Sequence, residues 1–397
     1  MSSPGTSLTP PVNRQITFAT IITFCSLYAA QPIQPLFQSQ FQLSHIQAIL
    51  FTTLMMAPLG VAPLVYGYLL ESFSARWMVR GALLILGLLE IIFAFADSYF
   101  TLLFIRAVQG LMIPAIITSF VSYISYTTPP DRVQHAIAAY IAATIVGGFL
   151  GRFLSGLCTD LFGWRFFFFL LGLLLLLNAH LLRGMVKDAK LHYARPRVAE
   201  VVGILKNRNF LWIYTAIFCL FFVFSALMNF LPFEFRRLHP GAGNTGIGLQ
   251  YLGYGMGILV SLNSRWIIRR FGGEGEAIRI GILIFGLGLL FFGVESYSVM
   301  FFGMFVFCTG LFTAHSLLSG LINKLALENK AVANGLYISF YYTGGTLDSF
   351  LPGAVYQRFG WQAFLGQLFL MVALALFFSV LLKRSLKQQE GHRDPVQ

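Results

Sequence analysis

The stretch GLCTDLFGWRFFFF, residues 156–169, has a counterpart in GAVYQRFGWQAFLG, residues 353–366. In both stretches a glycine stands eight residues before a tryptophan, and Phe-Gly directly precedes that tryptophan; Trp164 and Trp361 lie 197 residues apart. The glycine pairs Gly147-Gly148 and Gly344-Gly345 are separated by the same 197 residues. Two matched pieces in one register indicate an internal duplication whose two halves share one topology.

The composition around these stretches is that of a helical membrane protein. Of the 397 residues, 57% are hydrophobic and only 11% are charged. A soluble domain carries about 25% charged residues and about 45–50% apolar ones. The chain has too few charges to cover a globular surface, so a soluble protein is excluded. Its apolar runs are continuous and do not alternate, which excludes a lipid-facing β-barrel.

A bilayer core about 30 Å thick requires about 20 apolar residues per helix. By this measure the chain is predicted to be an all-α membrane protein with twelve transmembrane helices in two pseudo-symmetric six-helix halves. The amino-terminal half, residues 1–184, is predicted to hold helices at about 17–37, 45–69, 77–97, 99–124, 136–158 and 164–184. A cytoplasmic linker, residues 185–208, precedes the carboxy-terminal half, residues 209–382, with helices at about 209–234, 246–268, 277–295, 298–323, 333–356 and 361–382. Residues 383–397 are predicted to form a cytoplasmic tail.

The net charge of +12 reflects membrane topology. Most of the 27 Lys and Arg residues fall in the segments that are cytoplasmic when the N-terminus is inside. Both termini are therefore expected on the cytoplasmic side of a bacterial-type inner membrane, and the positive charge does not indicate a nucleic acid partner. No cleavable signal peptide is evident. The four cysteines lie in apolar runs without ligand-like spacing, and no motif calls for a metal or a cofactor.

Two motifs in the first half resemble those of the major facilitator superfamily. The loop from Gly67 to Arg76, GYLLESFSAR, resembles the family pattern G-x-x-x-D-[RK]-x-G-[RK]-[RK]; Gly67, Glu71 and Arg76 match it, whereas the two serines and the alanine between Glu71 and Arg76 depart from it. Arg106-Ala-Val-Gln109-Gly110 resembles the family's R-x-x-Q-G motif, whose arginine is associated with proton coupling. The resemblance covers essentially the whole chain.

A third motif favours one branch of that family. Gly147-Gly148-Phe-Leu-Gly151-Arg152 is similar to the antiporter motif G-P-x-x-G-G, with Gly148 in place of Pro and Arg152 in place of the last Gly. Together with Gln31-Pro32-Ile-Gln-Pro35 it looks most like the acriflavine-sensitivity branch of proton-coupled drug exporters. The resemblance implies a substrate site near the midplane between the halves, reached alternately from each side. It assigns gating roles to Gly67, Glu71, Arg76, Gly147, Gly148, Gly151 and Arg152.

Ionisable residues inside a membrane span are costly and usually face a cavity or a partner. On that ground Asp348 is the first candidate for a proton carrier and Glu90 the second, with His315 as a further titratable group and Arg106 as the residue that tunes the acid. Each has a structural alternative. Glu90 could pair permanently with a basic group of its own half, Asp348 could be a fixed gate partner of Arg152 or a packing acid, and His315 could be a satisfied interior histidine.

The substrate surface is expected to be aromatic with a few polar groups. Residues that recur on one helical face are the candidates: Tyr28 and Gln31, Ser225 and Asn229, His315, Ser319 and Asn323, and Tyr337 and Tyr341. Aromatic walls with few fixed charges accept varied amphiphiles, including cations through ring faces. The same side chains also pack helix against helix in membranes, which is the alternative for each.

The sequence therefore predicts a monomeric secondary transporter, not an enzyme. Its partners are a small-molecule substrate, protons and the lipid bilayer. We expect it to export small amphiphilic compounds in exchange for protons. The nearest alternative is proton-coupled uptake of a small metabolite or a siderophore-type metal chelate. A membrane enzyme or a receptor is the third, although the chain lacks clustered Asp or His on loops and a large extramembrane part.

Overall fold

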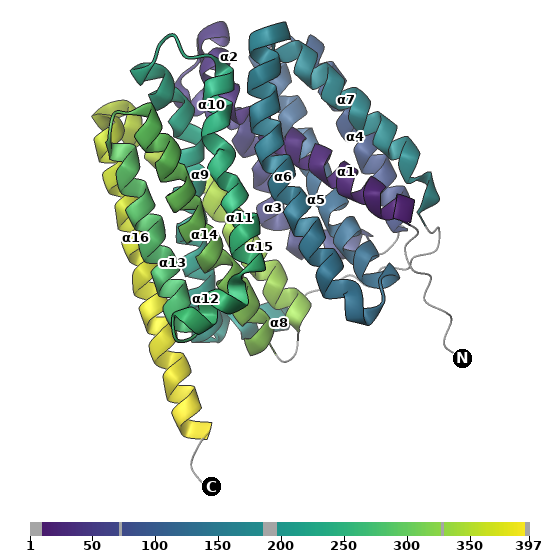
Figure 1. Ribbon diagram of the computed structural model, residues 1–397. Helices are drawn as coiled ribbons and strands as arrows, with labels where there is room; N and C mark the ends of the chain where they lie inside the picture. Colours follow the sequence, from purple (N-terminus) through teal and green to yellow (C-terminus); the bar gives the residue numbers. More distant parts are fainter. Residues whose placement is uncertain (1–9, 71–73, 186–196, 327–328, 394–397) are drawn as a thin grey trace. The chain divides into compact units, whose positions relative to one another are not determined.

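The computed structural model describes residues 10–70, 74–185, 197–326 and 329–393, and in these ranges its regular structure is entirely helical (Figure 1). The chain divides into two compact units. Unit 1 comprises Met1–Arg195 and His239–Tyr251, and unit 2 comprises Pro196–Leu238 and Leu252–Gln397. The short segment 239–251, which the sequence analysis placed in the second half, thus groups with unit 1. The residue limits predicted for the two halves stay a prediction.

The elements of unit 1 are α1 (Pro10–Tyr28), η1 (Gln31–Ile33), α2 (Gln34–Phe41), α3 (His45–Leu70), α4 (Ala75–Phe95), α5 (Tyr99–Thr127), α6 (Pro130–Phe162), α7 (Trp164–Leu181), η2 (Leu182–Gly184) and α10 (Asn244–Gln250). The elements of unit 2 are α8 (Val198–Lys206), α9 (Arg208–Leu238), α11 (Met256–Leu262), α12 (Ser264–Arg270), α13 (Glu274–Leu290), η4 (Phe291–Gly293), α14 (Tyr297–Leu325), α15 (Lys330–Leu347) and α16 (Leu351–Arg393). The short helix η3 (Tyr251–Gly255) links the two sets.

Ten helical segments within the described residues are long and apolar enough to cross a membrane. Three of the twelve predicted helices are built differently. The helix predicted at 17–37 is divided into α1, η1 and α2. The helix predicted at 246–268 is broken into α10, η3, α11 and α12, because this segment holds five glycines between residues 246 and 257, and each lowers helix propensity by about 1 kcal/mol relative to alanine. The helix predicted at 333–356 ends with α15 at Leu347, and its last residues belong to α16. A count of twelve spans stays a prediction.

The internal duplication is visible in the backbone. Gly163, between α6 and α7, has φ +86°, and Gly360, inside α16, has φ +78°. Both are left-handed conformations that glycine adopts at little cost and other residues resist. Each glycine directly precedes the buried tryptophan of its motif, Trp164 or Trp361. The shared Phe-Gly-Trp pattern therefore specifies a sharp corner between two helical segments in each unit.

The duplication extends to helix packing. In unit 1, α1 packs along α6, and a side-chain carbon at Gly147 would collide with the carbonyl oxygen of Ile21. In unit 2, α9 packs along α15, and a side-chain carbon at Gly344 would collide with the carbonyl oxygen of Phe218. The colliding partners are again 197 residues apart. Small residues allow helices in membranes to approach closely, so the paired glycines set the same helix contact twice.

Candidate functional site

Asp348, the first choice for the proton carrier, lies at the end of α15 and is fully buried. Its carboxylate accepts hydrogen bonds from Asn229 Nδ2 at 3.2 Å and from Ser349 Oγ at 2.8 Å. Ser225, one turn before Asn229 on α9, donates to the carbonyl oxygen of Gly345 at 3.3 Å. Within the described residues no cation pairs with Asp348. The cluster is therefore a buried acid surrounded by neutral hydrogen-bond donors.

The structure thus brings two predicted substrate residues, Ser225 and Asn229, next to the predicted proton carrier. A ligand that displaced Asn229 from the carboxylate would remove one of its hydrogen bonds. Because a buried carboxylate without enough donors is costly, loss of a donor favours uptake of a proton or binding of another donor. The arrangement can couple a ligand to a proton at one acid.

A second cluster in unit 2 joins His315 on α14 to two tyrosines on α15. The hydroxyl of Tyr337 lies 2.8 Å from His315 Nδ1 and 3.1 Å from its carbonyl oxygen. The ring of Tyr341 lies 5.0 Å from the imidazole and stacks on Phe221 of α9 at 3.5 Å. Among the described residues no charged side chain pairs with His315. The cluster is an aromatic surface of three rings, one of which is the imidazole of His315.

The other two residues predicted on the same face of α14 lie further along that helix. Ser319 is partly exposed, and its carbonyl oxygen accepts from Asn323 Nδ2 at 3.2 Å. The exposed Asn323 accepts from Asn334 of α15 at 2.7 Å. Among the described residues no side-chain hydrogen bond joins Ser319 or Asn323 to His315, although Ser319 lies one turn from His315 on the same face of α14.

In unit 1, Glu90 on α4 and Arg106 on α5 form an ion pair at 3.5 Å, with both side chains 0% exposed. Ser26 on α1 donates to Glu90 Oε1 at 2.5 Å, and Arg106 donates to Gln109 Oε1 at 3.0 Å. The Arg106 guanidinium carbon also lies 4.0 Å from the ring centre of Phe93. Glu90 thus has a counter-charge within its own unit, which corresponds to the structural alternative considered for it.

Arg152 on α6 lies between residues predicted to bind substrate. Its Nε donates to Gln31 Oε1 at 2.6 Å, and its Nη1 donates to the carbonyl oxygen of Gly148 at 2.8 Å. The guanidinium carbon lies 4.0 Å from the ring centre of Tyr28 and 5.0 Å from that of Tyr251. The predicted gating arginine therefore already occupies the face of Tyr28, and a cationic ligand would have to compete with it there.

The duplication relates the two charged centres. Residue 348 is the counterpart of Gly151, which approaches α1 so closely that a side-chain carbon would lie 2.5 Å from Cys25 Cα. The repeat thus aligns Gly151-Arg152 with Asp348-Ser349: the first pair contains an arginine and the second contains an aspartate. Unit 1 therefore has an arginine, and unit 2 has an aspartate, at adjacent positions of the repeat.

The remaining predicted gating residues are only partly described. Glu71 lies outside the described residues, and Gly67 belongs to α3. Arg76, in the first turn of α4, donates to the carbonyl oxygen of Met185 at 3.5 Å. Ser74, which departs from the family pattern, accepts a hydrogen bond from the backbone of Trp77 and caps α4. The departure thus has a local structural use.

Several buried partners of these charged residues were not predicted from the sequence. Ser26 and Ser349 complete the two acid clusters, and serines are too frequent in membrane helices to be selected by type alone. Glu234, buried on α9, forms an ion pair with Arg237 at 2.7 Å. Its spacing of three residues from that arginine was the available signal.

A scan against protein families matches the profile of the Major Facilitator Superfamily to residues 16–277. The chain is 26% identical to the uncharacterized MFS-type transporter YybF of Bacillus subtilis, with 97% of both chains covered. It is 26% identical to the inner membrane transport protein YnfM of Escherichia coli, covering 93% of this chain and 89% of that one. It is 21% identical to the multi-drug resistance efflux pump PmrA of Streptococcus pneumoniae, covering 93% and 95%.

Among solved structures, the chain resembles a bacterial homolog of the human lysosomal transporter Spinster in an inward-facing, unoccupied conformation. The TM-score is 0.77, at 15% sequence identity, and the likeness covers 96% of this chain and 98% of that one. At this identity the likeness shows the fold alone.

Proposed function

Because this chain belongs to the Major Facilitator Superfamily of transporters, we propose that it is a proton-coupled antiporter that exports small amphiphilic compounds by alternating access. The proposal includes a monomer of twelve transmembrane helices in the inner membrane, with both termini in the cytoplasm, and membership of the acriflavine-sensitivity branch. The inner membrane assignment is supported by the name of the relative YnfM.

The observation that carries the proposal is the environment of Asp348. A transporter driven by protons needs a group that is charged in one state and neutral in the other. Asp348 is buried and is held only by neutral donors in the described residues, so gain of a proton removes a charge that no neighbouring cation balances. Glu90 differs because Arg106 balances its charge. Asp348 is therefore the proposed proton carrier, and Glu90 with Arg106 a structural pair within unit 1.

The substrate class is proposed from the aromatic surface of unit 2. His315, Tyr337 and Tyr341 form a cluster of rings in which no charged side chain is paired among the described residues, and such aromatic walls suit flat or amphiphilic compounds. Export is favoured over uptake by the resemblance of GGFLGR at residues 147–152 to the antiporter motif. The relative PmrA, whose name describes an efflux pump, supports the same direction.

Transport of an acridine dye into inside-out vesicles tests the proposal. A proton gradient across vesicles that contain the protein is expected to drive accumulation that an uncoupler abolishes. Asp348→Asn should remove this accumulation yet retain dye exchange in the absence of a gradient, because the amide keeps the shape of the acid. Glu295→Gln, which changes an acid of unit 2 that is 60% exposed, is the matched control.

Two results would contradict parts of the proposal. Full gradient-driven accumulation by Asp348→Asn would remove Asp348 as the carrier and move the role to His315 or Glu90. Absence of accumulation in folded wild-type protein, together with proton-driven uptake of a metabolite into cells, would reverse the direction of transport.

A further inference from the structure

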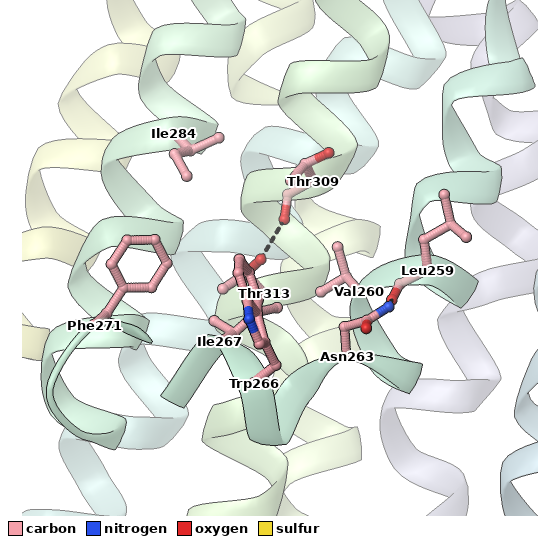
Figure 2. A pocket seen from close by; sticks show the side chains of 9 residues that line it. All are labelled: Leu259, Val260, Asn263, Trp266, Ile267, Phe271, Ile284, Thr309 and Thr313. Carbon is pink, nitrogen blue, oxygen red and sulfur yellow. Dashed lines mark hydrogen bonds between the residues drawn. The ribbon is translucent and has the colours of Figure 1, made fainter. Parts of the chain in front are cut away.

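Unit 2 contains an open cavity of about 470 Å³ beside the break between α11 and α12 (Figure 2). In this view Phe271 and Ile284 lie on one side, Leu259 and Val260 on the other, and two threonines of α14 between them. Leu259 is 55% exposed whereas Val260 is 6% exposed, so the cavity runs from the surface inward. Neither the proton carrier nor the aromatic surface described above takes part in it.

The break that borders this cavity is local. Asn263, with φ −100° and ψ 11°, separates α11 from α12, and each of these helices has only seven residues. The broken path places Leu259 and Ile267 on different short helices of the same wall.

The chemistry of the walls selects a hydrocarbon occupant. Three of the polar side chains that line the cavity already donate to backbone carbonyls one turn earlier: Thr309 to Phe305 at 2.7 Å, Thr313 to Thr309 at 2.7 Å, and Asn263 to Leu259 at 2.8 Å. The donors of Thr309, Thr313 and Asn263 are therefore occupied, and most other lining atoms are apolar. A flexible apolar chain fills such a space without leaving a buried polar group unpaired.

A cluster of cations lies on α12, the short helix that lines the cavity with Trp266 and Ile267. Arg269 and Arg270 follow the lining residue Trp266 by three and four residues on α12, which places them on neighbouring positions of the same helical face. Both are exposed, as is Arg265, and none of the three has an ion-pair partner among the described residues. The α12 arginines are defined here as these three residues.

The nearby acids are already paired with other cations. Glu274 at the start of α13 pairs with Lys324 at 2.5 Å, and Glu276 pairs with Arg279 at 3.1 Å and also with Lys383. The α12 arginines therefore present uncompensated positive charge. Trp266, which is 57% exposed, adds the type of amphipathic ring that prefers the membrane interface.

We propose that this cavity binds one anionic phospholipid, with an acyl chain between α11, α13 and α14 and the headgroup phosphate against Arg269 and Arg270. Basic residues beside a gap between membrane helices suit anionic headgroups, and the apolar walls suit the chain. A cationic amphiphile would meet repulsion from the α12 arginines. A free phosphate would leave the apolar cavity unfilled.

Quenching of Trp266 fluorescence tests the site in the purified full-length protein. The protein in detergent is titrated with phosphatidylglycerol that carries bromine atoms on its acyl chains, and in parallel with brominated phosphatidylcholine. The chain has five tryptophans, so the Trp266→Phe variant isolates the signal of Trp266. The expected result is quenching of Trp266 at low phosphatidylglycerol concentration and roughly tenfold weaker binding of phosphatidylcholine, since basic residues attract an anionic headgroup.

Variants separate the two parts of the site. Arg269→Gln/Arg270→Gln should weaken phosphatidylglycerol binding roughly tenfold or more, and Ile284→Phe should weaken both lipids by filling the cavity. The matched control is Arg208→Gln/Arg384→Gln, which removes two exposed arginines of unit 2 that do not line the cavity and should change nothing.

Three results would overturn the proposal. Equal quenching by both lipids would show that headgroup charge is not recognised. Full competition by inorganic phosphate would assign the arginines to a free anion, and competition by the transported dye would assign the cavity to transport. Because the readout is lipid binding, failure here leaves the proposed antiport unaffected.

Discussion

Replacement of Glu90 by glutamine is expected to destabilise unit 1 strongly, because it leaves the Arg106 guanidinium buried without a counter-charge. Both side chains are 0% exposed and lie 3.5 Å apart. Glutamine keeps the size of the side chain and an oxygen that can accept from Ser26, so the main change is the lost charge. Removal of one partner of a buried ion pair costs about 3–5 kcal/mol.

The surroundings of Arg106 place the expected cost near the lower limit. The rings of Phe93 and Phe168 lie 4.0 Å and 4.7 Å from its guanidinium carbon and remain to stabilise the cation. We therefore expect a loss of about 3 kcal/mol, or roughly 100-fold in the unfolding equilibrium. Arg106→Met should cost a similar amount, because it leaves the Glu90 carboxylate buried without a counter-charge.

The double variant Glu90→Gln/Arg106→Met supplies the decisive comparison. With both charges removed, its stability should return to within about 1 kcal/mol of the wild type. Equilibrium unfolding of the full-length protein in mixed micelles with increasing dodecyl sulfate measures all four forms. A double variant as unstable as the sum of the single variants would refute the reasoning, since the two charges would then not be coupled.

Asp348→Asn should lose proton-driven accumulation but change the free energy of unfolding by only about 1 kcal/mol, because only neutral hydrogen bonds are altered; a loss as large as that of Glu90→Gln would contradict this. Gly344→Val should destabilise by about 1–3 kcal/mol through its collision with the Phe218 carbonyl, whereas Gly366→Ala, with no atom within 4 Å, should be neutral or slightly stabilising in the same assay. Asp160 accepts hydrogen bonds from the backbones and side chains of Asn244 and Thr245. Asp160→Ala removes these bonds and should raise the thiol-labelling rate of a cysteine introduced by Ala242→Cys roughly tenfold. An unchanged labelling rate, or an equal rise with Asp97→Ala, would contradict this prediction.

The helical class and the duplication were predictable from the sequence because each depends on patterns repeated over many residues. The family assignment is confirmed by the profile match, and the Phe-Gly-Trp corners have the positive φ that their glycines allow. The segment predicted as one helix at 246–268 is divided into α10, η3, α11 and α12, because its hydropathy is that of a span whereas its glycines weaken a continuous helix.

The partners of the buried charges were harder to predict. Asp348 and Asn229 are 119 residues apart, and only the packing of α9 on α15 brings them together. Glu90 and Arg106 were both selected because they are charges inside spans, yet their pairing depends on the rotation of α4 against α5. Helix rotation is set by many weak contacts, which a single sequence does not reveal. The roles of these residues in transport stay predictions.

The two corner tryptophans give this protein a pair of matched optical reporters. Trp164 is 5% exposed and donates to Gln40 at 3.0 Å, and Trp361 is 6% exposed and donates to Phe292 at 2.7 Å. Versions that retain one or the other as the sole tryptophan should start from similar emission wavelengths. A substrate that shifts the emission of one version and not the other would then locate its effect in a single unit, without an added label.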